Sequence, residues 1–159
     1  MDTKSVNDSD AANPAAPADT ATINEMIEVL NDGIAFYTEA MQDVARPDLK
    51  ALFGRMASHK KQIASELAEA VRQLSDVPSA SGTFAGSMRK LYAELRTRMT
   101  SDKDDEYVAQ LEEFEDRILH TFEAAATDAD DATVRGIATN YMSAVREDHD
   151  FMRDLKKAP

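Results

Sequence analysis

The stretch INEMIEVLNDGIAFYTEAMQDV, residues 23–44, decides the fold. Its apolar residues recur at alternating spacings of four and three, which places them on one face of a helix. Thr22 and Glu25 form a helix-start pattern, in which the hydroxyl caps a backbone amide and the carboxylate reaches back. We therefore predict a long helix over residues 22–45. Its apolar seam consists of Ile23, Ile27, Leu30, Ile34, Tyr37, Met41 and Val44.

Other segments repeat this periodicity. Pro47 suits the first position of a second helix, and the short links at 45–46 and 128–129 predict two antiparallel hairpins. A shorter amphipathic segment between the hairpins returns the chain along the bundle, so the second and third long helices run parallel. We predict an all-α fold, a ferritin-like four-helix bundle within residues 21–157. Its remaining helices are expected at about 47–75, 103–127 and 130–157, with a crossover helix at about 84–99.

The composition limits the function classes. Residues 1–20 are rich in Ala, Asp, Asn, Ser and Pro and hold too little apolar surface to offset ordering entropy, so we predict a disordered tail. A net charge of −12 disfavours binding to nucleic acid. The absence of cysteine excludes disulfides and zinc–thiolate sites. We find neither a signal-peptide pattern nor an apolar run of the ~20 residues that span a membrane, and expect a cytoplasmic protein.

Polar residues interrupt the apolar seams near the helix midpoints. A buried carboxylate without a partner would cost several kcal/mol or stay protonated. Our hypothesis is that Lys60 supplies the positive charge that Glu115 needs, while two tyrosines donate hydrogen bonds. In the alternative reading, Lys60 extends from the seam edge to solvent and Glu115 tilts outward. The predicted buried polar cluster consists of Tyr37, Lys60, Glu115 and Tyr141.

The spacing typical of di-metal carboxylate bundles is missing. Such sites take a Glu-x-x-His pair from each of two helices, because three residues place both ligands on one face. The residues three positions before the histidines are Met56, Arg117 and Arg146. We therefore predict no catalytic residue and no cofactor. The alternative is iron or another divalent metal at an atypical site, with the candidate ligands His59, Glu66, Glu115 and His149.

The expected crossover helix has a basic side. An amphipathic helix of this kind can dock onto an anionic partner, or it can cover the bundle while its bases face the acidic long helices. We weigh the second reading more heavily. The basic patch consists of Arg89, Lys90, Arg96 and Arg98.

The opening INEMIEVLNDGIAFY, residues 23–37, resembles a bacterial ferritin-like family known as domain of unknown function 2383. The likeness extends over most of residues 22–155. It includes Pro47-Asp48-Leu49-Lys50, Glu66-Leu67, residues 82–95, Glu115-Asp116 and His149-Asp150. The resemblance implies a four-helix ferritin-like bundle and no established activity. The chain departs from the family at Ala35, where relatives often carry an acidic residue, and at Tyr92, where they often carry Trp.

Together these observations predict a non-catalytic bundle of unknown physiological role. We expect it to act through its surface or by self-association as a homo-oligomer, and a role in stress physiology is an analogy with the fold alone. One alternative is a metal-binding or redox protein that uses the atypical carboxylate and histidine site. A second alternative is an adaptor that docks a protein partner through the basic crossover helix.

Overall fold

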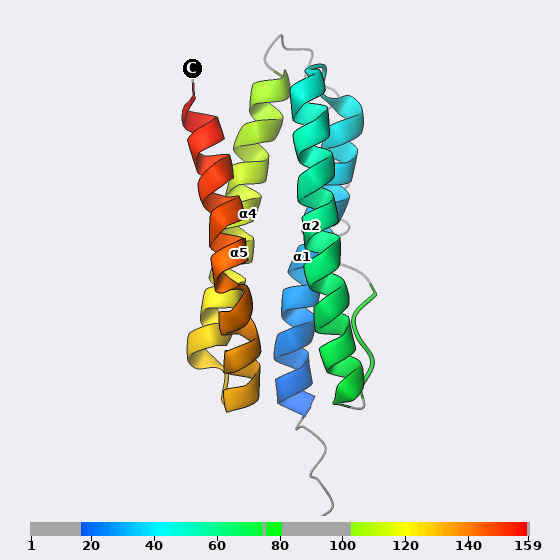
Figure 1. The fold of residues 1–159 in the computed structure, drawn as a ribbon, viewed down its shortest axis with the longest axis vertical. Coiled ribbons are helices and arrows are strands. Elements are labelled where there is room, and N and C mark those ends of the chain that lie inside the picture. Colours follow the sequence, from blue (N-terminus) through cyan, green and yellow to red (C-terminus); the bar gives the residue numbers. More distant parts are fainter. Residues whose placement is uncertain (1–16, 75, 81–102, 159) are drawn as a thin grey trace, which may run out of the picture.

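The computed structural model describes residues 17–74, 76–80 and 103–158, and within them it contains four helices and no strand. They are α1 (Pro17–Asp43), α2 (Pro47–Gln73), α4 (Lys103–Asp128) and α5 (Ala132–Lys157) (Figure 1). The predicted all-α fold is confirmed. The expected crossover helix and residues 1–16 of the expected tail lie outside the described residues.

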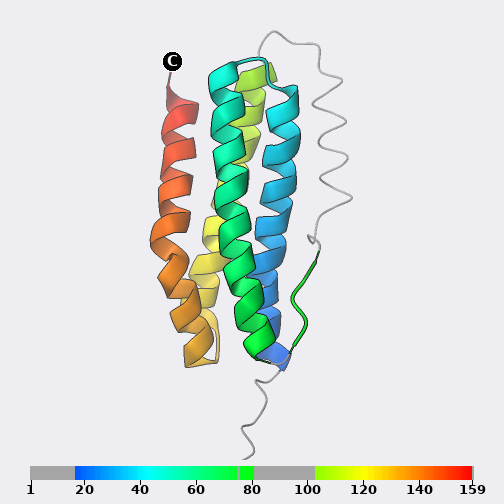
Figure 2. The same ribbon diagram turned by 45° about the vertical axis from the view of Figure 1, so that its right-hand side comes forward.

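The helices form two antiparallel hairpins, α1–α2 and α4–α5, packed side by side (Figure 2). Helices α1 and α5 run in one direction, and α2 and α4 run in the other. The parallel course of the second and third long helices, α2 and α4, is as predicted. No described helix is long and apolar enough to cross a membrane.

Helix α1 begins at Pro17, earlier than the start predicted at residue 22. The sequence pattern at Thr22 did not account for contacts made by residues distant in the chain. Thr20 is 2% exposed, and its hydroxyl donates a hydrogen bond to Asp76 Oδ2 at 2.5 Å. Residues 17–20 are therefore part of the first helix instead of the tail.

The ends of α4 and α5 are fixed by side chains. The Asp104 carboxylate accepts hydrogen bonds from the backbone N–H groups of Ala45 and Arg46, which joins the start of α4 to the turn of the first hairpin. Asp131 caps α5 by accepting from the backbone N–H groups of Thr133 and Val134 at 2.7 and 3.1 Å. Such a cap satisfies amides that have no partner inside the helix.

Helix α1 buries two faces, because it lies between α2 and α4. On one face the Tyr37 ring packs against Phe53 of α2, with centroids 5.7 Å apart. On the other, Phe36 packs against Tyr107 and Phe114 of α4 at 6.3 and 6.1 Å. Pairs at these distances lie within the favourable range for aromatic rings. The helix that decides the fold is thus the central element of the core.

Helix α5 is the least buried of the four helices. Its fully buried residues are Val134, Ala138, Val145 and Met152. It packs mainly against α4, its partner in the hairpin. On the side that faces α2, it makes polar contacts that form the candidate site.

Candidate functional site

Lys60 lies in the core and is surrounded by charged and polar groups from the other helices. Its side chain is 2% exposed, and Nζ lies 2.5 Å from Glu115 Oε1 of α4 and 3.3 Å from Asp148 Oδ2 of α5. The Glu115 side chain is fully buried. Since α2 and α4 belong to different hairpins, this ion pair joins the two halves of the molecule through their common core.

Tyr37 of α1 completes the contacts of the buried glutamate. Its hydroxyl donates to Glu115 Oε1 at 2.6 Å, and the Lys60 ammonium lies 4.9 Å from the centre of its ring. Burial, followed by the nearby Glu115 carboxylate, raises the pKa of Tyr37 well above its usual value. The phenol therefore stays protonated and serves as a donor. Glu115 Oε2, in contrast, has no hydrogen-bond partner among the described residues.

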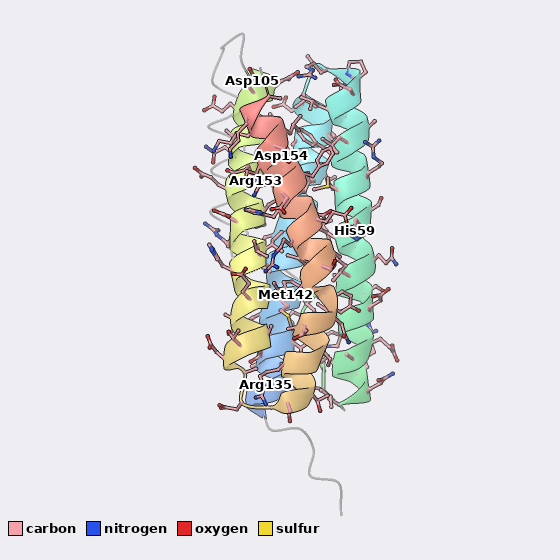
Figure 3. The ribbon with its side chains drawn as sticks, turned by 60° about the vertical axis from the view of Figure 1, so that its left-hand side comes forward. His59, Asp105, Arg135, Met142, Arg153 and Asp154 are labelled. Atoms are coloured by element: carbon pink, nitrogen blue, oxygen red, sulfur yellow. The ribbon has the colours of Figure 1, made fainter. Side chains whose placement is uncertain are left out.

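Asp148 and His59 connect the buried charges to the surface. His59 Nδ1 lies 2.9 Å from Asp148 Oδ2, the same oxygen that contacts the Lys60 ammonium. The His59 side chain is 39% exposed, whereas that of Asp148 is 14% exposed. Figure 3 shows His59 on α2 beside α5, near the middle of the bundle. A chain of polar contacts thus runs from solvent to Glu115.

Gly33 of α1 provides the space for the Lys60 stem. A Cβ atom at this position would lie 3.3 Å from Lys60 Cδ and 3.2 Å from Ile118 Cδ1. Both distances are tighter than ordinary van der Waals contact, so a larger residue would push against the lysine. The sequence shows Gly33 beside the apolar seam, but its contact with Lys60 becomes visible only in the structure.

Tyr141 does not join the cluster predicted for it. Its hydroxyl donates to Glu66 Oε2 at 2.6 Å, and burial, together with this carboxylate, raises the pKa of Tyr141 to about 12. Tyr141 lies about 10 Å along α5 from Asp148, and Glu66 about 9 Å along α2 from Lys60. The two contacts therefore lie at different heights, and Asp148 takes the place beside Lys60. Asp148 stands seven residues after Tyr141, so helical periodicity places both on one face of the last helix, and this spacing was the available signal.

His149 forms a separate cluster with two aspartates. Its Nε2 lies 2.6 Å from Asp116 Oδ1 and its Nδ1 lies 3.0 Å from Asp150 Oδ1. Burial opposes protonation of the ring, but the hydrogen bonds to Asp150 and Asp116 outweigh it and raise the pKa of His149. The side chain is 12% exposed. It bridges α4 and α5 within the second hairpin.

The four candidate metal ligands thus have different partners. Glu115 contacts Lys60, Glu66 contacts Tyr141, His59 contacts Asp148, and His149 contacts Asp116. Within the part of the chain that the structure describes, no three such side chains are grouped to hold one metal ion. An ammonium between two carboxylates also repels a dication. The residues around Lys60, in the middle of the bundle, therefore do not fit a metal pair of the ferritin type.

The Lys60 cluster is arranged to hold charge in place. A substrate could reach Lys60 or Glu115 only after the helices separated, since neither side chain is accessible. The predicted basic patch of Arg89, Lys90, Arg96 and Arg98 lies outside the described residues. The cluster is thus a buried ion-pair network to which all four helices contribute.

Comparison with known proteins assigns a family to the chain but no activity. No curated protein matches the chain. A family model matches residues 19–128, from near the start of α1 to the end of α4. The match includes Tyr37, Lys60 and Glu115, and Asp148 lies beyond it. Because the match covers more than half of its length, the chain belongs to the family described as domain of unknown function (DUF2383).

Proposed function

We propose that this protein is a non-catalytic bundle of ferritin-like plan that acts through its surface, by self-association or by binding a protein partner. One observation carries the proposal. The Lys60 ammonium lies between Glu115 and Asp148, at the level where a bundle of this plan would place a metal. A cation that belongs to the chain lies between the two acids there. The cluster around Lys60 then stabilises the fold, and the outer faces of the bundle are the surfaces that bind other molecules.

The energetics of the cluster support a structural role. Burying charges costs several kcal/mol per ion, and the cost is recovered only when the partners are close and further hydrogen bonds are made. Glu115 meets this condition at Oε1 through Lys60 and Tyr37. Asp148 meets it through Lys60 and His59. Removing the lysine would leave the fully buried Glu115 carboxylate without a positive charge beside it.

The first test measures metal chemistry directly. Protein purified without added metal is analysed for its elements, and a ferrous oxidation assay is run on the same sample. We expect no stoichiometric metal and no oxidation above the rate in buffer. Iron near two equivalents per chain, with rapid oxidation of ferrous iron, would establish the rival metal or redox function.

The second test measures what Lys60 does. Lys60→Met should lower the free energy of unfolding by about 3–5 kcal/mol, because it leaves the buried Glu115 carboxylate without its counter-ion. Urea unfolding at neutral pH provides the measurement. Lys50→Met is the matched control on the exposed side of α2, where a change within about 0.5 kcal/mol is expected. Equal stability of the two variants would contradict the proposed role of the lysine.

A further inference from the structure

We infer that the outward face of α2 binds an acidic helix of a partner protein. The inference rests on the proposed function, because it names the chemistry of the partner for a protein that acts through its surface. Figure 2 shows α2 in front of the bundle, between α5 and α1. We call this surface the α2 outer face, and it consists of Lys50, Ala51, Gly54, Arg55, Ser58 and Lys61, all exposed except the half-buried glycine.

The middle of α2 is basic in a chain that is acidic overall. Residues 49–65 contain Lys50, Arg55, Lys60 and Lys61 and no acid, whereas the whole chain has a net charge of −12. Lys60 is buried in the core, and the other three bases are exposed. The α2 outer face therefore has the opposite sign to the molecule as a whole, and its local field attracts anions.

The three exposed bases of α2 lack acidic partners. In the part of the chain that the structure describes, none of them forms an ion pair. Exposed bases of α5, in contrast, pair with acids of α4: Arg146 lies 3.4 Å from Glu123, and Lys156 lies 3.0 Å from Glu112. A chain with thirty acids and eighteen bases has acids enough for its bases, so a group of three unpaired bases is open to an external anion.

The nearest acids are engaged with other partners or lie apart from the face. On α2, Asp48 pairs with Arg46 before the basic run, and Glu66 after it accepts a hydrogen bond from Tyr141. Glu147 of α5 is exposed, and among the described residues it forms no ion pair with α2. An external acid can therefore bind the α2 outer face without breaking an ion pair of this chain.

The three bases lie on both sides of a strip of small residues. At about 100° of rotation and 1.5 Å of rise per residue, Lys50 and Lys61 share one side of the helix and lie about 16 Å apart along its axis. Arg55 lies roughly 120–140° around the helix from them, on the side of α5, where it lines the small groove that contains Phe151. A ligand on this face is thus contacted by positive charge from both sides.

The strip between the bases is the floor of an open groove. Ala51, Gly54 and Ser58 line the groove together with Thr38 and Met41 of α1, and its volume is about 720 Å³. None of the three α2 residues has a long side chain, so a partner helix can approach closely, near the lower end of the roughly 8–10 Å range for packed helices. The two α1 residues are uncharged, so the wall of the groove adds no negative charge.

An acidic helix fits this arrangement better than a nucleic acid or a membrane does. A helix laid along α2 has the same rise per residue, so carboxylates about eleven residues apart reach both lysines, and one between them on the other flank reaches Arg55. Nucleic acids and anionic membranes carry extended arrays of negative charge, which the net charge of −12 repels. A short acidic segment brings only the few charges that the face can meet.

Isothermal titration calorimetry of the full chain with a synthetic acidic peptide tests the inference. The probe contains only alanine and glutamate, with glutamates on both sides of an alanine stripe, and its length of about 20 residues lets it form a helix in isolation. At about 50 mM salt we expect a dissociation constant on the order of 10–100 μM, because exposed ion pairs contribute little each. Affinity should fall at least about tenfold at about 300 mM salt.

Charge reversal on the face identifies where the peptide binds. Arg55→Glu combined with Lys61→Glu should raise the dissociation constant at least about tenfold, while the helical circular dichroism is unchanged. Arg72→Glu combined with Lys157→Glu is the matched control, because it changes the net charge by the same amount at exposed positions away from the face. The control should bind the peptide within about threefold of wild type.

Three results would overturn the inference. They are no binding at about 1 mM peptide, equal losses of affinity in the two double variants, and equally tight binding of a single-stranded DNA of the same length. Metal content and ferrous oxidation are measured separately. Failure of the peptide to bind therefore leaves the proposed function in place with its partner on another face, whereas bound iron would overturn the proposed function whatever the peptide does.

Discussion

A single lysine connects all four helices of this bundle. Lys60 belongs to α2, forms ion pairs with Glu115 of α4 and Asp148 of α5, and lies beneath the Tyr37 ring of α1. Exchange of this positively charged side chain for an apolar one would remove its contacts with all three of these residues. At the scale of the residue, the site is therefore a set of mutually dependent polar groups, as expected of buried networks.

A second residue, His149, should make stability depend on pH. Its hydrogen bonds to Asp150 and Asp116 raise its pKa despite burial. Because the pKa of His149 is raised in the folded state, the contribution of this histidine to the free energy of unfolding is complete below its unfolded-state pKa, about 6.5. That contribution is lost as the pH rises through the folded-state pKa. His149→Gln should therefore cost on the order of 1 kcal/mol at pH 5.5 and much less at pH 8.5. Urea unfolding at both pH values provides the measurement.

A substitution at Asp116 tests whether the contacts of His149 cause this pH dependence. Asp116→Asn removes the carboxylate that contacts His149 Nε2. In that background the pH-dependent cost of His149→Gln should shrink, because one cause of the raised pKa is gone. A cost of His149→Gln that is the same at pH 5.5 and pH 8.5 would contradict the assignment.

At the scale of the element, two glycines of similar sequence context should respond in opposite directions. Gly33→Ala adds a methyl group 3.2–3.3 Å from Ile118 and Lys60, so it should destabilise the protein by about 1–3 kcal/mol. Gly136→Ala on α5 meets nothing within 4 Å and should stabilise it by about 0.5–1 kcal/mol through helix propensity. Thermal and urea unfolding of both variants measure the difference.

The two variants control for each other, because both replace a helical glycine with alanine. If Gly33→Ala were also stabilising, helix propensity would outweigh the contact, and the close approach to Lys60 would not constrain the packing. A destabilised Gly136→Ala would show that α5 is restrained by something beyond its described neighbours.

Helix periodicity predicted which segments are helical, but it could not predict how many faces each helix buries. The seam of α1 correctly includes Tyr37, yet Phe36 is buried as well, at 1% exposed, because a second helix covers it. A single seam describes contact with one neighbour, and a central helix has two. Likewise, helix midpoints suggested that Tyr141 lies beside Lys60, whereas the axial register of α5 places Asp148 there. Register depends on the hairpin turns and on packing, which local spacing does not contain.

At the scale of the whole molecule, the two hairpins are unequal. Helix α1 is buried on two faces, whereas α5 has few buried residues and packs mainly on α4. Its connection to α2 depends on side-chain contacts such as that of Tyr141 with Glu66. Regions with few buried apolar contacts open at lower free energy than the core. The bundle should therefore loosen first at the α2–α5 seam.

Native-state hydrogen exchange tests this order of opening. Backbone amides in the middle of α5 should exchange through an opening that costs less free energy than the opening of α1. Tyr141→Phe removes the hydroxyl that donates to Glu66, so it should lower protection in α5 more than in α1. Tyr107→Phe is the matched control, because its hydroxyl donates to Asp43 between α4 and α1, and it should leave the difference between the hairpins in place. Equal protection of α1 and α5 in the wild type would mean that the bundle opens as one unit, and the polar seam would then be as strong as the apolar core.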